Sequence, residues 1–300
     1  MASQSVTSTP AADLLEKGRG RGFYADAMRR FRANFAATVG LGVLVLLIVV
    51  AIAAPLLTLH DPTKMYYNHT LESPNSIFPL GTDSLGRDIY SRIVMGSRIS
   101  LQTGLVAVFI AAIIGVPMGA IAGYFGKWVD SLLMRAADVM LAFPGIIFAI
   151  WLISILGPSL RNVMIAVGLF SVPGFARVTR SSTLAVKEMD FVFAERAIGA
   201  GSLHVLVKHI VPNVIQPVIV LASLRVASAI IAAASLSFLG FGAQPPTPDW
   251  GAMLSDGRRY LQTAWWIAFF PGLAIMIMVL ATNMVGDGLR DALDPRFQNR

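Results

Sequence analysis

The sequence predicts an all-α membrane protein with six transmembrane helices. Of its 300 residues, 55% are hydrophobic and 14% are charged, and the mean hydropathy is +0.67, which indicates a chain solvated largely by lipid. Lipid offers the backbone no hydrogen bonds, and the sequence lacks the alternation of a membrane barrel, so the spans should be helices. About twenty residues at about 1.5 Å each cross the hydrocarbon core. The predicted spans are residues 34–58, 99–123, 132–156, 162–182, 212–240 and 264–286.

The first span follows a polar tail that contains six Lys or Arg residues. A cleaved signal peptide is the alternative, but its apolar region has only about 7 to 15 residues before a small-residue cleavage site. Here the apolar run continues from Phe35 to Leu59. The segment is therefore predicted to be an uncleaved membrane helix.

Small residues recur at a four-residue spacing in two later spans. This spacing places them on one helix face, where another backbone can approach closely. They are Gly115, Gly119 and Gly123 in the second span, and Ala229, Ala233 and Ser237 in the fifth. We also expect helix breaks at Pro144, Pro173 and Pro217, and the fourth span is the weakest because Gly174 follows its proline.

Lys and Arg residues are placed asymmetrically about the spans. With the N-terminus in the cytoplasm, sixteen lie inside and seven outside, as the positive-inside rule favours. This placement accounts for the net charge of +7 and the pI near 10.0 without nucleic acid as a partner. The predicted organisation is a cytoplasmic tail at 1–33, a transmembrane domain at 34–290 with external loops at about 59–98 and 241–263, and a cytoplasmic tail at 291–300.

One cation, Arg225, lies inside the fifth predicted span. A guanidinium at membrane depth is costly, so it should face protein or a water-filled cavity. Arg225 is therefore a candidate for the translocation pathway. The alternatives are a structural partner to a carbonyl or carboxylate, or a side chain that reaches toward the membrane surface. The spans contain no series of Asp, Glu and His, which counts against a proton-driven carrier.

The segment at about 187–211 is more polar than the spans on either side. Asp190 can cap a short helix, Gly199 can end it in the left-handed conformation, Ser202 can cap the next helix, and Pro212 suits the first turn of the fifth span. We therefore expect a short helix, a glycine turn and a second helix at the cytoplasmic surface.

The short helix carries apolar residues on nearly every side, so one supporting surface would leave some of them in water. Its own membrane domain can cover one side, and a groove on a second protein would cover the other. The alternative is an interfacial helix that rests on lipid headgroups. The apolar residues are Phe191, Val192, Phe193, Ala194, Ala197 and Ile198.

This segment resembles the cytoplasmic coupling motif of ABC importer permeases, in which a proline follows a glycine by thirteen residues. Gly199 and Pro212 have that spacing, and Ala194 and Ala197 precede the glycine. The motif's glutamate would fall at Phe193, whereas this chain has Glu195 two residues later. The residues that the resemblance implies for ATPase coupling are Asp190, Phe191, Val192, Phe193, Ala194, Glu195, Arg196, Ala197, Gly199 and Ala200.

The resemblance extends over most of the chain beyond the N-terminal tail. The stretches GTDSLGRDIYSRIVMGSRISL, AGYFGKWVDSLLMRAADVMLAFP, SLSFLGFGAQPPTPDWGAML and NMVGDGLRDALDPR are similar to the second, C-type, permease subunit of dipeptide, oligopeptide, glutathione and nickel importers. The resemblance implies a type I ABC importer permease fold in the bacterial plasma (inner) membrane. It also implies a heterodimer with a homologous permease, two cytoplasmic ATPase subunits and an extracytoplasmic solute-binding protein.

The implied function is half of a translocation pathway for di- or oligopeptides, with glutathione or nickel complexes as alternatives. The chain has no GxxxxGK[ST] loop, so ATP and Mg²⁺ are expected on the partner ATPases, with no cofactor here. Its four histidines form no HExxH motif, and GTDSLGRD lacks the ligand series of a calcium loop, so neither catalytic nor metal-binding residues are predicted. A self-contained secondary carrier is the more distant alternative.

Overall fold

The computed structural model describes residues 23–293, and within that range the chain is helical, with no strand beyond an isolated bridge between Thr82 and Asp88. Most of both predicted tails lies outside the described residues. Two 3-10 helices, Tyr67–His69 and Arg258–Tyr260, and a π-helix, Val205–Ile210, accompany the α-helices. The α-helices are α2 (Phe23–Ala33), α3 (Phe35–Leu57), α4 (Ile89–Phe125), α5 (Lys127–Leu141), α6 (Gly145–Leu156), α7 (Leu160–Val186), α8 (Asp190–Ala197), α9 (Ser202–His204), α10 (Val211–Phe238), α11 (Trp250–Gly257) and α12 (Trp266–Leu293).

Five helical stretches of the described chain are long and apolar enough to cross a membrane, and a bent pair makes up to six. The bent pair is α5 and α6, which meet at 91°. The break expected at Pro144 is therefore confirmed, because the third span predicted at 132–156 is divided there into α5 and α6. Pro144 occupies the N-cap position of α6, just outside the helix. Proline suits this break because it has no N–H to donate and keeps the preceding residue out of the helical conformation.

The other two expected breaks are absent from the described helices. Pro173 lies inside the continuous helix α7, and Pro217 lies inside α10. A proline removes one backbone hydrogen bond, but neighbouring helices can hold the rest of the span in place. Val172 and Phe175, on either side of Pro173, are buried, so packing keeps α7 continuous there.

Three boundaries differ from the sequence-based expectation. Helix α4 begins at Ile89, so the preceding loop ends at residue 88 rather than 98. Asp88 caps α4, because its side chain accepts hydrogen bonds from the backbone N–H groups of Tyr90 and Ser91. Helix α12 continues to Leu293, beyond the expected limit at residue 290. Part of the predicted N-terminal tail is helix α2, which packs on α3 and α12.

The predicted close packing through the glycines of the second span is confirmed, and α7 is the helix that approaches. A Cβ atom on Gly115 would lie 2.7 Å from the Val172 carbonyl oxygen, and one on Gly123 would lie 2.9 Å from the Arg180 carbonyl oxygen. Gly119 faces the same helix at Ala176. Only glycine allows the α4 and α7 backbones to lie this close.

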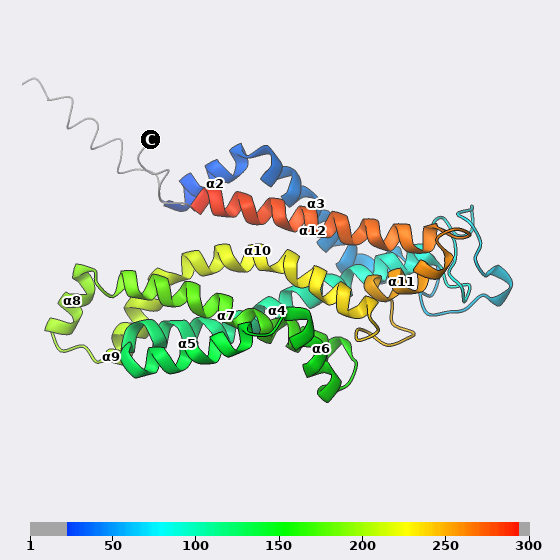
Figure 1. The fold of residues 1–300 in the computed structure, drawn as a ribbon. Helices are drawn as coiled ribbons and strands as arrows, with labels where there is room; N and C mark the ends of the chain where they lie inside the picture. Colours follow the sequence, from blue (N-terminus) through cyan, green and yellow to red (C-terminus); the bar gives the residue numbers. More distant parts are fainter. Residues whose placement is uncertain (1–22, 294–300) are drawn as a thin grey trace, which may run out of the picture.

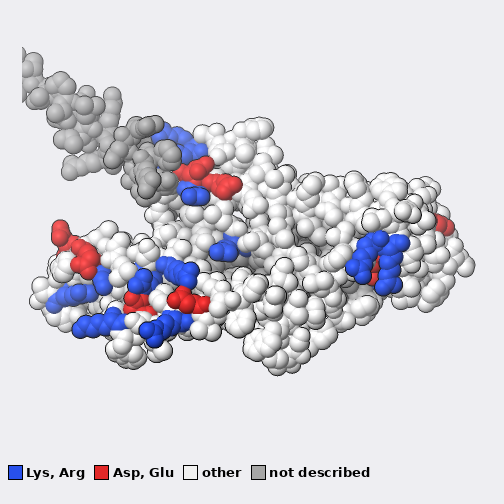
Figure 2. Space-filling model, in the orientation of Figure 1, with Lys and Arg blue, Asp and Glu red and all other residues white. Residues whose placement is uncertain are grey.

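The loops separate into two groups at opposite ends of the bundle (Figure 1). Helices α2, α8 and α9 lie at one end, with the last turn of α12; the loop at 58–88 and α11 lie at the other. Figure 2 shows charged side chains gathered at both ends of the visible face, with a broad uncharged band between them that one small basic patch interrupts. This arrangement suits a bundle that crosses lipid.

Candidate functional site

Helix α8 and the turn after it form the expected short helix and glycine turn. Gly199 has φ +89°; its N–H donates to the Arg196 carbonyl, and the Ala200 N–H donates to the Glu195 carbonyl, both at 3.0 Å. This pair of hydrogen bonds is the Schellman arrangement that glycine favours at a helix C-terminus. The left-handed role predicted for Gly199 is confirmed.

Both predicted N-caps in this segment were wrong by one residue. Met189 occupies the cap position of α8 without a side-chain hydrogen bond, and Asp190 is the first helical residue. Its charge still favours the helix N-terminus there. Gly201 precedes α9, and Ser202 is likewise the first helical residue. Pro212 lies in the first turn of α10, as predicted.

Helix α8 is buried on one side only. Val192 is 0% exposed and packs in a cluster with Val186, Val205 and Ile210 from the adjoining helices. On the remaining surface Phe191 is 38% exposed, Phe193 48% and Ile198 81%. The described chain thus covers one face of α8 and leaves an apolar face open, which is the arrangement expected of a helix that needs a second support.

The segment after the glycine turn continues directly into the fifth span. Helix α9 passes through the π-helix Val205–Ile210 into α10 without a loop. π-Helical turns are rare and often occur at functional sites. A displacement of α8 would therefore reach α10 through the buried contacts of Val192 with Val205 and Ile210, and through the glycine turn that leads into α9.

Charged and aromatic contacts fix the orientation of α8. The Arg196 guanidinium lies 5.1 Å from the centre of the Tyr124 ring, which belongs to the last turn of α4. Glu195 lies 3.5 Å from His209 Nε2 in the π-helix. Glu195 therefore faces its own chain in this structure, and the role of the motif's glutamate cannot be transferred to it.

Two ion pairs that the sequence did not reveal join α5 to α7 near the same end. Arg180 donates from Nε to Asp130 Oδ1 at 2.5 Å and from Nη2 to Asp130 Oδ2 at 2.6 Å. Arg177 donates to Asp138 at 2.5 Å. The partners are far apart in sequence, so no local pattern could have paired them. They attach the first half of the bent span to α7.

Arg225 lies in α10 and is partly exposed. A Cβ atom on Gly174 of α7 would lie 3.1 Å from Arg225 Nη2 and 3.6 Å from Cζ. The guanidinium therefore rests against the α7 backbone at the residue that has no side chain. The sequence singled out both residues without relating them.

At the end opposite α8, buried polar contacts join the two loops. Arg92 Nη1 donates to the carbonyls of Pro62 at 2.9 Å and Pro246 at 3.3 Å, and Arg87 pairs with Asp83 at 2.6 Å. Arg92 is buried, and its hydrogen bonds hold the polar first turn of α4 beneath the loops. The segment between α10 and α11, which contains Pro246, is therefore held against the loop at 58–88.

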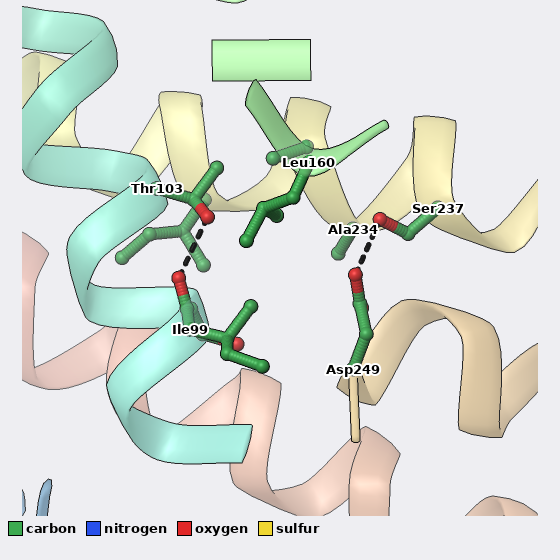
Figure 3. Close-up of a pocket in the computed structure, with 9 residues that line it drawn as sticks. Ile99, Thr103, Leu160, Ala234, Ser237 and Asp249 are labelled. Atoms are coloured by element: carbon green, nitrogen blue, oxygen red, sulfur yellow. Dashed lines mark hydrogen bonds between the residues drawn. The ribbon is translucent and has the colours of Figure 1, made fainter. Parts of the chain in front are cut away.

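A small cavity lies beneath these loops (Figure 3). Asp249 caps α11 by accepting from the Gly251 N–H at 2.8 Å, and it accepts from Ser237 Oγ at 2.8 Å across the cavity wall. Thr103 and Leu160 line the opposite wall. The volume is about 10 Å³, space for about one water molecule, so this cavity cannot hold a transported solute.

Comparison with known proteins identifies the architecture. The family described as binding-protein-dependent transport system inner membrane component matches residues 115–299, and the N-terminal TM domain of oligopeptide transport permease C matches residues 22–74. An inward-facing structure of the MetNI methionine ABC transporter superposes with a TM-score of 0.55 at 18% identity, covering 69% of this chain and 98% of that chain. The likeness shows the type I ABC importer permease fold, as predicted.

Two curated relatives place the chain in a narrower group of permeases within this family. The dipeptide transport system permease protein DppC of Alkalihalophilus pseudofirmus is 46% identical over 276 residues, which cover 92% of this chain and 91% of the relative. The glutathione transport system permease protein GsiD of Pectobacterium atrosepticum is 47% identical over 278 residues, 92% of each chain. The chain belongs to the binding-protein-dependent transport system inner membrane component family, as a C-type ABC permease of the DppC and GsiD group.

Proposed function

We propose that this permease forms half of the translocation pathway of an ATP-driven importer for di- or oligopeptides. Its relatives are named for dipeptide and glutathione transport, and glutathione is itself a small peptide. The two relatives are almost equally similar to this chain, so sequence identity does not choose between their substrates. Uptake of a dipeptide and of glutathione by the same reconstituted complex would separate the two.

The proposed complex contains a homologous permease, two ATPase subunits and a solute-binding protein. ATP and Mg²⁺ bind the ATPases, and this chain performs no chemical step and holds no cofactor. The end that carries α8 faces the cytoplasm, both termini lie on that side, and the complex lies in the bacterial inner membrane. The excess of Lys and Arg residues on the α8 side supports this orientation.

The observation that carries the coupling role is the open apolar face of α8. Val192 anchors the helix to its own domain, while Phe191 and Phe193 remain partly exposed. Burying each phenylalanine in a groove of an ATPase subunit would contribute about 1.5 to 3 kcal/mol as an upper range, since part of each ring is already covered. A few contacts of this size are enough for a stable joint between the two subunits.

The test is co-purification of the ATPase subunits with a Phe191→Asp, Phe193→Asp double variant. We expect membrane insertion at the normal level and loss of the ATPases, because two carboxylates would be buried in an apolar groove. The matched control is Tyr67→Asp with Ile77→Asp, which places the same charges on exposed apolar residues of the opposite end. Co-purification of the ATPases at the wild-type level with the first variant would contradict the proposal.

A further inference from the structure

Arg225 is the one residue in α10 with a charged side chain, and it lies near the midpoint of that helix, Val211–Phe238. The α7 residue against which it rests, Gly174, is also near the middle of its helix, Leu160–Val186. Helix α7 is a candidate membrane span, and α10 is part of the candidate span Ser202–Phe238. The guanidinium is therefore placed at mid-depth of the membrane, away from the charged ends.

The guanidinium has a defined position but no counter-charge in the described chain. Within residues 23–293 it makes no hydrogen bond or ion pair, whereas Arg177 and Arg180 of the neighbouring α7 each pair with an aspartate of α5. The space for it exists because residue 174 has no Cβ; an alanine methyl there would lie 3.1 Å from Nη2. The side chain is also partly exposed, so its donors remain accessible.

An unpaired guanidinium at this depth is costly against lipid, which implies that it faces water or an anionic group. Its planar set of N–H donors matches a carboxylate, with two parallel hydrogen bonds. A peptide with net negative charge supplies such a carboxylate. A permanent carboxylate partner, by contrast, would neutralise the site and is absent from this chain's described spans around Arg225.

We infer that Arg225, held over Gly174, binds a carboxylate of anionic peptide ligands as they pass the middle of the membrane. This inference rests on the proposed function, because it assigns a ligand class to that pathway. The Arg225 guanidinium should bind peptides with net negative charge more strongly than zwitterionic peptides, because the ammonium group of a zwitterion offsets the attraction of its carboxylate.

The experiment uses the complete importer in proteoliposomes, with the binding protein loaded to saturation so that its own selectivity does not limit uptake. The probes are the dipeptides Ala-Glu and Ala-Gln, which differ by one carboxylate, and glutathione. We expect Arg225→Gln to lower the Ala-Glu to Ala-Gln uptake ratio about tenfold, equivalent to about 1.4 kcal/mol. Arg225→Lys keeps the positive charge but loses the planar set of N–H donors, so the Ala-Glu to Ala-Gln uptake ratio should fall less than it does in Arg225→Gln.

Gly174→Ala provides a second variant that leaves the charge in place. Its methyl group would lie 3.1 Å from Nη2 and so shift the guanidinium slightly, and we therefore expect a change in the same direction that is smaller than that of Arg225→Gln. The control is Arg135→Gln, which removes an exposed cation from α5, a different helix. The control should leave the ratio unchanged. Equal amounts of purified complex establish that the variants assemble.

Four outcomes would overturn the inference. Equal loss of both dipeptides in Arg225→Gln would make the arginine structural. Loss of the homologous permease from the purified Arg225→Gln complex would mean that its counter-charge lies on that subunit. If the wild-type complex took up neither dipeptide nor glutathione, the proposed function itself would fail and the inference with it; normal wild-type uptake with an unchanged ratio would remove only the Arg225 site.

Discussion

A close backbone contact between α4 and α7 makes a sharp prediction about Gly115. A Cβ on this residue would lie 2.6 Å from Phe175 Cβ and 2.7 Å from the Val172 carbonyl oxygen of α7. Non-bonded carbon atoms ordinarily approach to about 3.5 Å, so α4 and α7 would have to separate by roughly 0.9 Å to relieve the contact with Phe175 Cβ. Overpacking of this kind costs about 1–3 kcal/mol, because the obstructing atoms include backbone that cannot rotate away.

The assay for Gly115→Ala is thermal unfolding of the purified chain in detergent. At about 2–4 °C per kcal/mol, we expect a midpoint lower by about 2–12 °C. The control is Gly42→Ala in α3, where an added Cβ meets nothing within 4 Å. That substitution should leave the midpoint unchanged or raise it, because alanine favours helix. Equal midpoints for the two variants would refute the close contact between α4 and α7.

Three further predictions concern the two ends of the bundle. Asp130→Asn should destabilise the chain by about 1 kcal/mol, and Arg180→Gln should add little in that background, as measured by a double-mutant cycle; additive losses would contradict direct pairing. Gly199→Ala should cost about 1–2 kcal/mol through its φ of +89° and speed amide exchange in α8 alone; exchange at the wild-type rate would contradict it. Asp249→Ala should lower the unfolding midpoint by an amount equivalent to about 1–3 kcal/mol, because Ser237 and a backbone N–H lose their acceptor; an unchanged midpoint would show that water replaces the carboxylate.

Hydropathy and spacing predicted the features that depend on local sequence. Long apolar runs located the spans, and the glycine repeat in the second span predicted its close contact with another helix. Gly199 was predicted as a helix end because glycine adopts the left-handed conformation at the least cost. Asp249 directly before Trp250 is also a local capping signal, and it could have located the start of α11.

The remaining features depend on contacts between distant residues. Pro144 pointed to a break but not to the 91° angle, which depends on how α5 and α6 pack against α7. The first turns of α4 were assigned to a loop because they are polar; their polarity is accommodated by buried partners such as the carbonyls of Pro62 and Pro246. Arg225 was recognisable as a cation at membrane depth, but its position over Gly174 required the packing of α10 on α7.

The most direct test of the central claim is the accessibility of α8 to a thiol reagent. The chain contains no cysteine, so Phe193→Cys introduces a single reporter on the open face of the helix. We predict that a membrane-impermeant maleimide labels it from the cytoplasmic side when the permease is alone, and that bound ATPase subunits protect it. Equal labelling with and without the ATPases, or labelling from the outer side, would contradict the account.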